Sequence, residues 1–195
     1  MRYEPYLMHH GVKGQKWGVR RYQNKDGTLT NAGKLKRRKE TVFISGSSKT
    51  QTDDSPYRRK ALPKEIQQTL NEIMERKANV VVGDAPGIDR QVQDFFNAHN
   101  YDKVTVYGPG KAVRYSANQK WKTKPIDAPE FEEGSKEWLA KKDIEMERVS
   151  TSGVAVVLDE GAKATRKNVD RLLQNGKTVK VYELSKYGKK HDRWL

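Results

Sequence analysis

Residues 79–99 read Asn79-Val80-Val81-Val82-Gly83-Asp84-Ala85-Pro86-Gly87-Ile88-Asp89-Arg90-Gln91-Val92-Gln93-Asp94-Phe95-Phe96-Asn97-Ala98-His99, and this stretch decides the fold class. The three valines predict a short buried strand, and the apolar residues from Ile88 onward recur at helical spacing. A strand, a glycine-rich turn and a helix N-terminus favour an anion site, because backbone N–H groups and the helix dipole point at one place. The same turn also occurs in α/β proteins that bind nothing there. Its spacing is neither the dinucleotide fingerprint nor the ATP-type P-loop.

Four more short apolar stretches lie around this unit, and segments with helical spacing separate them. They occupy residues 41–44, 104–107, 153–158 and 178–182. Buried-type strands that alternate with amphipathic helices predict an α/β protein. We expect a Rossmann-like, doubly wound, mainly parallel five-stranded sheet with helices on both faces, plus a basic N-terminal extension. The polar residues 111–134 form a connection long enough to be functional or partly disordered.

The formal charge of +14 is concentrated at the two ends of the 195-residue chain. Residues 1–40 hold 11 Lys/Arg and 3 Asp/Glu, residues 184–195 hold 4 and 1, and residues 41–183 hold 24 and 21. Such ends are typical of interaction tails, which either bind phosphate backbones or keep a protein soluble. We therefore expect a basic extension over 1–40, one domain over 41–184 and a basic tail over 185–195.

Composition excludes several classes of site. The chain has no cysteine, so a disulfide framework, a thiolate metal site and a cysteine nucleophile are all excluded. The four histidines are too scattered to indicate a metal cluster, and we expect neither a metal nor a cofactor. No apolar run has the length of a membrane span, and the N-terminus lacks the apolar segment of a secretory signal. The expectation is a soluble intracellular protein without a membrane partner.

The N-terminal extension interleaves glycine, basic and aromatic residues. It contains His9-His10-Gly11-Val12-Lys13-Gly14-Gln15-Lys16-Trp17-Gly18-Val19-Arg20-Arg21-Tyr22, then a turn signal at 24–27 and a helix-cap candidate at Thr30. Residues 9–34 resemble a peptide found at the front of many phage structural and cargo proteins. The resemblance implies a phage-encoded protein in the host cytoplasm or the virion, with capsid proteins, head proteins or DNA as partners of residues 1–40. The alternative is a disordered cationic tail.

Three turns rich in glycine, serine or polar residues each follow a predicted strand. They are residues 45–48, 84–89 and 160–168. Because the carboxyl ends of parallel strands meet at one edge of a sheet, we expect these turns to lie together there. Ligands of such sheets bind outside this edge, near the point where the strand order reverses.

Four motifs carry a second resemblance, which spans about residues 41–184. They are residues 43–47, 82–89, 142–146 and 165–177. In these motifs the chain resembles the SLOG superfamily, a Rossmann-like group whose members bind nucleotides, cleave them or bind DNA. The resemblance implies a nucleotide or nucleotide-derived ligand and a homo-oligomer. The ligand-binding residues that it implies are Ser45, Gly46, Ser47, Gly83, Asp84, Gly87, Asp89, Arg114, Asp143, Thr165, Arg166 and Asn168.

The chain departs from the hydrolytic members of that group at one position. Their loop carries a glutamate that cleaves the N-glycosidic bond, and here Asn168 takes its place. An amide donates a hydrogen bond, but it is neither a nucleophile nor a base near neutral pH. Binding or sequestration of a nucleotide signal, with a role in counter-defence, is therefore favoured. The alternatives are N-glycoside hydrolysis of a nucleoside monophosphate or NAD-like nucleotide by Asp84, Asp89 or Glu160, and DNA binding through the basic ends.

Several of these residues also have a purely structural interpretation. Asp84 and Asp89 are also suited to capping the following helix. Arg114 is either a phosphate clamp or a surface cation, and Asp143 either pairs with a lysine or faces the ligand edge. Trp121 either stacks on a base or pins its loop to the core, and pinning is favoured.

Overall fold

The computed structural model describes residues 22–24, 26–28, 30, 39–47, 62–158, 162–184 and, for the backbone only, 190–194. The chain divides into two compact units, Met1–Lys39 and Glu40–Leu195. In the first unit the predicted turn at 24–27 is confirmed, since the Gly27 N–H donates to the Asn24 carbonyl at 3.1 Å and Gly27 has a φ of +85°. The expected helix after Thr30, most of the phage-type peptide and Glu160 lie outside the described residues.

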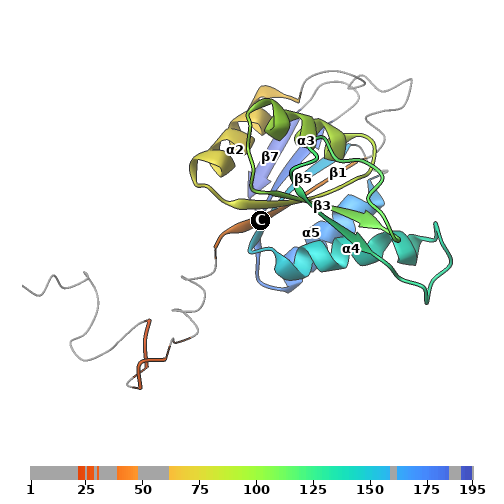
Figure 1. Ribbon diagram of the computed structural model, residues 1–195. Helices are drawn as coiled ribbons and strands as arrows, with labels where there is room; N and C mark the ends of the chain where they lie inside the picture. Colours follow the sequence, from red (N-terminus) through yellow and green to blue (C-terminus); the bar gives the residue numbers. More distant parts are fainter. Residues whose placement is uncertain are drawn as a thin grey trace, which may run out of the picture. The chain divides into compact units, whose positions relative to one another are not determined.

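In the second unit, the described strands form one seven-stranded sheet in the order β4-β3-β2-β1-β5-β6-β7 (Figure 1). The strands are β1 (Thr41–Gly46), β2 (Asn79–Gly83), β3 (Val104–Pro109), β4 (Lys122–Ile126), β5 (Ser152–Leu158), β6 (Thr178–Leu184) and β7 (Lys190–Trp194). All neighbours pair in parallel except β6 and β7, which are antiparallel. The predicted Rossmann-like, mainly parallel α/β fold is confirmed.

The sheet has two strands more than the five that the sequence predicts. β4 lies in the connection that was expected to be irregular, and β7 lies in the segment that was expected to be a tail. Both are the outermost strands of the sheet, and each pairs on one side only among the described residues. Neither Lys122–Ile126 nor Lys190–Trp194 carries the apolar run or alternation by which a strand is predicted, so neither strand was expected.

Four helices in the described part of this unit cover the two faces of the sheet, as Figure 1 shows. They are α2 (Lys64–Glu75), α3 (Ile88–Ala98), α4 (Lys136–Val149) and α5 (Lys163–Gln174). Buried residues of α2 and α3 pack on one face, and those of α4 and α5 pack on the other. No helix in the described part of the chain is long and apolar enough to cross a membrane.

The strand order reverses beside β1. The chain adds β2, β3 and β4 outward on one side of β1, and α4 then returns it to β5 on the other side. The carboxyl ends of β1 and β5 therefore mark the topological switch point, where ligands of open α/β sheets bind.

The long connection between β3 and β4 is fixed along α3. The Ala117 N–H donates to the Gln93 side chain at 3.0 Å, and the Asn118 amide donates to the Asn97 side chain at 3.0 Å. Trp121 is buried, and its indole N–H donates to the Tyr101 carbonyl at 2.9 Å. The pinning role of Trp121 is thus confirmed.

Candidate functional site

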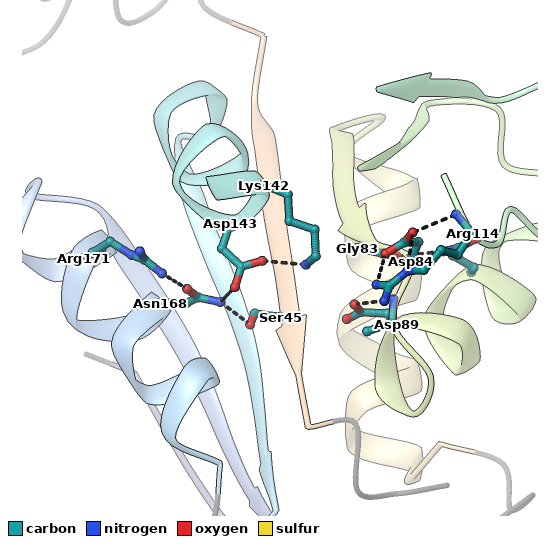
Figure 2. A network of polar contacts seen from close by, with 11 residues as sticks. Ser45, Gly83, Asp84, Asp89, Arg114, Lys142, Asp143, Asn168 and Arg171 are labelled. Atoms are coloured by element: carbon teal, nitrogen blue, oxygen red, sulfur yellow. Dashed lines mark hydrogen bonds and ion pairs between the residues drawn. The ribbon is translucent and has the colours of Figure 1, made fainter. Parts of the chain in front are cut away.

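Six of the polar residues predicted at the carboxyl edge lie in the network of polar contacts that Figure 2 shows: Ser45, Asp84, Asp89, Arg114, Asp143 and Asn168. The Asn168 amide of α5 donates to the Ser45 hydroxyl of β1 at 2.8 Å and to the Asp143 carboxylate of α4 at 3.0 Å. Asn168 is 3% exposed, so this contact is part of the interior. Asn168 therefore holds three elements, α5, β1 and α4, together.

Lys142 continues this network on α4. Its Nζ lies 2.6 Å from the Asp143 carboxylate, and the residue is 7% exposed. Burial pulls the pKa of Lys142 down, but the carboxylates of Asp143, Asp89 and Asp84 outweigh burial and raise the pKa above its ordinary value. Asp143 therefore pairs with a lysine, as one of its two interpretations predicts, and it does so inside the predicted site.

Asp89 faces Lys142 from the first turn of α3. A Cβ placed on Gly83 would lie 2.3 Å from the Asp89 carboxylate and 2.9 Å from the Lys142 Nζ, so both groups converge on the end of β2. Burial raises the pKa of Asp89 to about 7, with Asp143 and Asp84 adding to the rise, and Lys142 and the Ala85 N–H opposing it. The Ala85 N–H donates to Asp89 at 3.3 Å, and no side chain caps α3.

Asp84 is held by Arg114. The backbone N–H and Nε of Arg114 donate to Asp84 Oδ2 at 2.8 and 3.0 Å, and Nη2 donates to Oδ1 at 2.5 Å. Asp84 is 1% exposed, whereas the Arg114 side chain is 47% exposed. The hydrogen bond to Asp84 raises the pKa of Arg114. Asp84 thus orients a cation at the carboxyl edge, and the cap interpretation of Asp84 is wrong.

The glycines at the strand ends have a packing role. A Cβ on Gly46 would lie 2.3 Å from the Ile88 side chain, and one on Gly83 would meet Asp89 and Lys142. Side chains of this chain therefore occupy the space beside both glycines. Gly87 precedes α3 with a φ of +91°, which favours glycine.

Two helices begin at this edge without a side-chain cap, α3 after Gly87 and α5 after Ala162. Thr165 lies buried in the first turn of α5. Arg166 is partly exposed and pairs with Glu183 at 3.4 Å. The Ser47 N–H donates to the Val156 carbonyl at 3.1 Å, which ties the end of β1 to β5. The Ile88 N–H at the start of α3 donates to the Ser47 carbonyl at 3.3 Å. The dipole and the first-turn N–H groups of a helix favour an anion at its N-terminus.

Three residues of the network were not predicted as site residues. Lys142 is buried beside Asp143, and its only signal was its place within the 142–146 motif. Gln93 is fully buried and donates to the Gly83 carbonyl at 2.7 Å. A polar residue of an amphipathic helix is expected on the exposed face, so the sequence did not indicate this burial. Arg171 donates to the Asn168 side chain, and its Nε has no hydrogen-bond partner among the described residues. The described part of the chain contains no group of three His, Asp or Glu side chains placed to hold a metal.

The pH dependence of stability is expected to report the burial of Asp89. Between its ordinary pKa of 3.8 and about 7, the folded protein keeps a proton that the unfolded chain releases. The free energy of unfolding therefore falls as pH rises through this window because of Asp89, by about 1.4 kcal/mol for each unit of pKa shift. Urea titrations of Asp89→Asn at pH 5 and pH 8 should no longer show this fall in the free energy of unfolding between the two pH values. Exposed Asp102→Asn is the control. An unchanged slope in Asp89→Asn would contradict the assignment.

Comparison with known proteins adds a fold relationship. Residues 2–24 match a family of unknown function (DUF7211). No curated protein matches the chain. A solved structure of DNA processing protein A from Helicobacter pylori, described as having a unique single-stranded DNA binding mode, is similar with 15% identity and a TM-score of 0.50. The similarity covers 76% of this chain and 67% of that chain, and at this identity it supports the fold alone.

Proposed function

We propose that the domain binds a nucleotide or nucleotide-derived signal at the carboxyl edge of its sheet, between the ends of β1 and β5. The observation that carries this proposal is the reversal of strand order at β1, beside which α3 and α5 begin without side-chain caps. The first turn of α5 and its neighbourhood are basic, with Lys163, Arg166 and Lys167 before the first acid at Asp170. A phosphate placed there meets helix N–H groups and cations.

The buried network supports binding rather than hydrolysis. The Asn168 amide does not ionise near neutral pH, so it is neither a general acid nor a general base, and its NH2 group donates to Ser45 and Asp143. Asp84 is paired with Arg114, and Asp89 is 6% exposed. In this proposal these groups hold the edge in shape, and the ligand contacts the backbone N–H groups, Arg114 and Arg166. The proposal also includes a counter-defence role in an infected host, for a protein that is packaged in the virion or made after infection, and its support is the resemblance of residues 9–34 to a phage peptide.

The test is ligand retention by the full-length protein. AMP, ADP-ribose and NAD are incubated with it, and bound and free species are separated and weighed by mass spectrometry. We expect an intact nucleotide, and we expect Arg166→Gln to bind roughly 10-fold more weakly, because a charge-assisted hydrogen bond is lost. Arg148→Gln, on an exposed ion pair of α4, is the matched control. A released base would instead indicate the hydrolase alternative.

DNA binding is the second candidate, and the observation that favours it is the concentration of positive charge at the two ends of the chain. Retention of no nucleotide, combined with DNA affinity that falls steeply with salt, would support this candidate over the first.

A further inference from the structure

Leu139 is an exposed apolar side chain on the stripe of α4 that faces the sheet. Leu139, Lys142, Asp143 and Met146 recur at helical spacing, so they lie on one side of the helix. Met146 packs in the core below the sheet and is 1% exposed, and Lys142 is also buried, whereas Leu139 is 37% exposed. The later turns of this stripe are therefore covered, and its first turn is open.

The hydrogen bonds of Asn168 fix the level of Leu139 relative to the sheet. Asn168 joins Ser45, the penultimate residue of β1, to Asp143 of α4. Leu139 precedes Asp143 by about one helical turn, which is about 5.4 Å. α4 runs from the carboxyl edge to the start of β5, and it meets α5 on β1, which contacts both helices. Leu139 therefore lies just outside the carboxyl end of β1, at the switch point.

The two helices that meet at this point differ in charge and capping at their starts. α4 begins at Ser135, whose hydroxyl accepts the Trp138 N–H at 3.1 Å, and its first turn contains Glu137. α5 begins without a side-chain cap, has no acid in its first turn and carries Lys163 and Arg166. A negative group is therefore favoured at the start of α5 and disfavoured at the start of α4.

The other large apolar side chains that are exposed in the described part of the chain, Ile144 and Leu173, lie elsewhere. Ile144 shares the outer side of α4 with Lys141 and Arg148, which both pair with glutamates. Leu173 lies in the last turn of α5, which leads back to the start of β6. Of the three, Leu139 alone lies at the carboxyl edge.

We propose that Leu139 determines specificity at the switch-point site, by packing against the base of a ligand whose phosphate lies at the start of α5. This inference rests on the proposed function and names the part of the ligand that α4 contacts. An exposed leucine gains free energy when a ring removes its surface from water. Ligand sites combine such apolar contacts with a few polar groups that fix orientation. The ligand is accordingly a phosphate ester that carries a base, and not inorganic phosphate, a polyphosphate or a sugar phosphate.

The test compares AMP with ribose 5-phosphate by calorimetric titration of the full-length protein. The two probes share the sugar and the phosphate, and only AMP carries a base. Leu139→Ala is expected to weaken AMP binding roughly 10-fold, because apolar contact with the base is lost, and to leave the affinity for ribose 5-phosphate unchanged. The heat-capacity change of AMP binding should also become less negative in this variant, since less apolar surface is buried.

Three further variants complete the test. Leu139→Met keeps an apolar side chain of similar volume and should bind AMP almost as the wild type does. Leu139→Gln, a good helix former of similar length, should repeat the loss seen in Leu139→Ala. Ile144→Ala is the matched control, because it removes an equally exposed apolar side chain from the other side of α4.

The outcomes separate this inference from the proposed function. AMP bound equally by Leu139→Ala and Ile144→Ala, or equal losses of AMP and ribose 5-phosphate in Leu139→Ala, would overturn the role of Leu139 and leave the nucleotide site standing. Failure of the wild type to bind AMP, ADP-ribose or NAD would overturn both.

Discussion

Lys142→Met is expected to lower the free energy of unfolding by about 3–5 kcal/mol at pH 8, the usual cost of removing one partner of a buried ion pair. Lys142 is the cation that lies among Asp143, Asp89 and Asp84, and methionine would leave these carboxylates without it in a buried place. The loss should shrink at pH 5, because Asp89 is then protonated. Urea denaturation at the two pH values measures both effects.

Lys141→Met is the matched control for this variant. Lys141 is the preceding residue of the same helix, but its side chain is 38% exposed and pairs with a half-exposed glutamate. An exposed pair contributes about 0–1 kcal/mol, so this variant should be close to the wild type. If Lys142→Met were as stable as Lys141→Met, the network would not depend on the buried ammonium group.

Gly83→Ala is expected to destabilise the domain by about 3 kcal/mol, at the upper end of the cost of overpacking. The added methyl group would lie 2.3 Å from the Asp89 carboxylate and 2.9 Å from the Lys142 Nζ, and both of these groups are buried. These groups or the backbone must shift to make room for the methyl group. The melting temperature and the urea midpoint measure the loss.

Two variants separate this clash from a general cost of losing glycine. Gly134→Ala has nothing within 4 Å of the new atom but a φ of +84°, so it should cost only about 1–2 kcal/mol of backbone strain. Gly83→Ala combined with Asp89→Ala should recover part of the stability, because the nearest clashing group is gone. A double variant less stable than Gly83→Ala alone would show that the contact with Asp89 is not the cause.

Lys142→Met and Gly83→Ala bear on function because both change the network that shapes the proposed ligand edge. Lys142, Asp143 and Asn168 hold α4, α5 and β1 together just below the point where α5 begins. A change there should weaken nucleotide retention through position rather than through direct contact.

The candidate site was predicted in outline only. The sequence and the SLOG resemblance predicted Ser45, Asp143 and Asn168 as residues of one site, and hydrogen bonds join them in the structure. They did not show that Asn168 lies beside a serine 123 residues away, or that Lys142 fills the space next to Asp89. Such contacts depend on how three helices pack, which no local pattern encodes.

The sequence by itself determined the order of strands and helices and the edge where the turns meet, because apolar periodicity marks each element and parallel strands place their carboxyl ends together. The outer strands β4 and β7, the partners of each charged side chain and the raised pKa of Asp89 were decided by the tertiary structure alone. The physical reason is that pairing at a sheet edge and burial of a charge depend on groups from distant parts of the chain. Their energies arise only when these groups are brought together and removed from water.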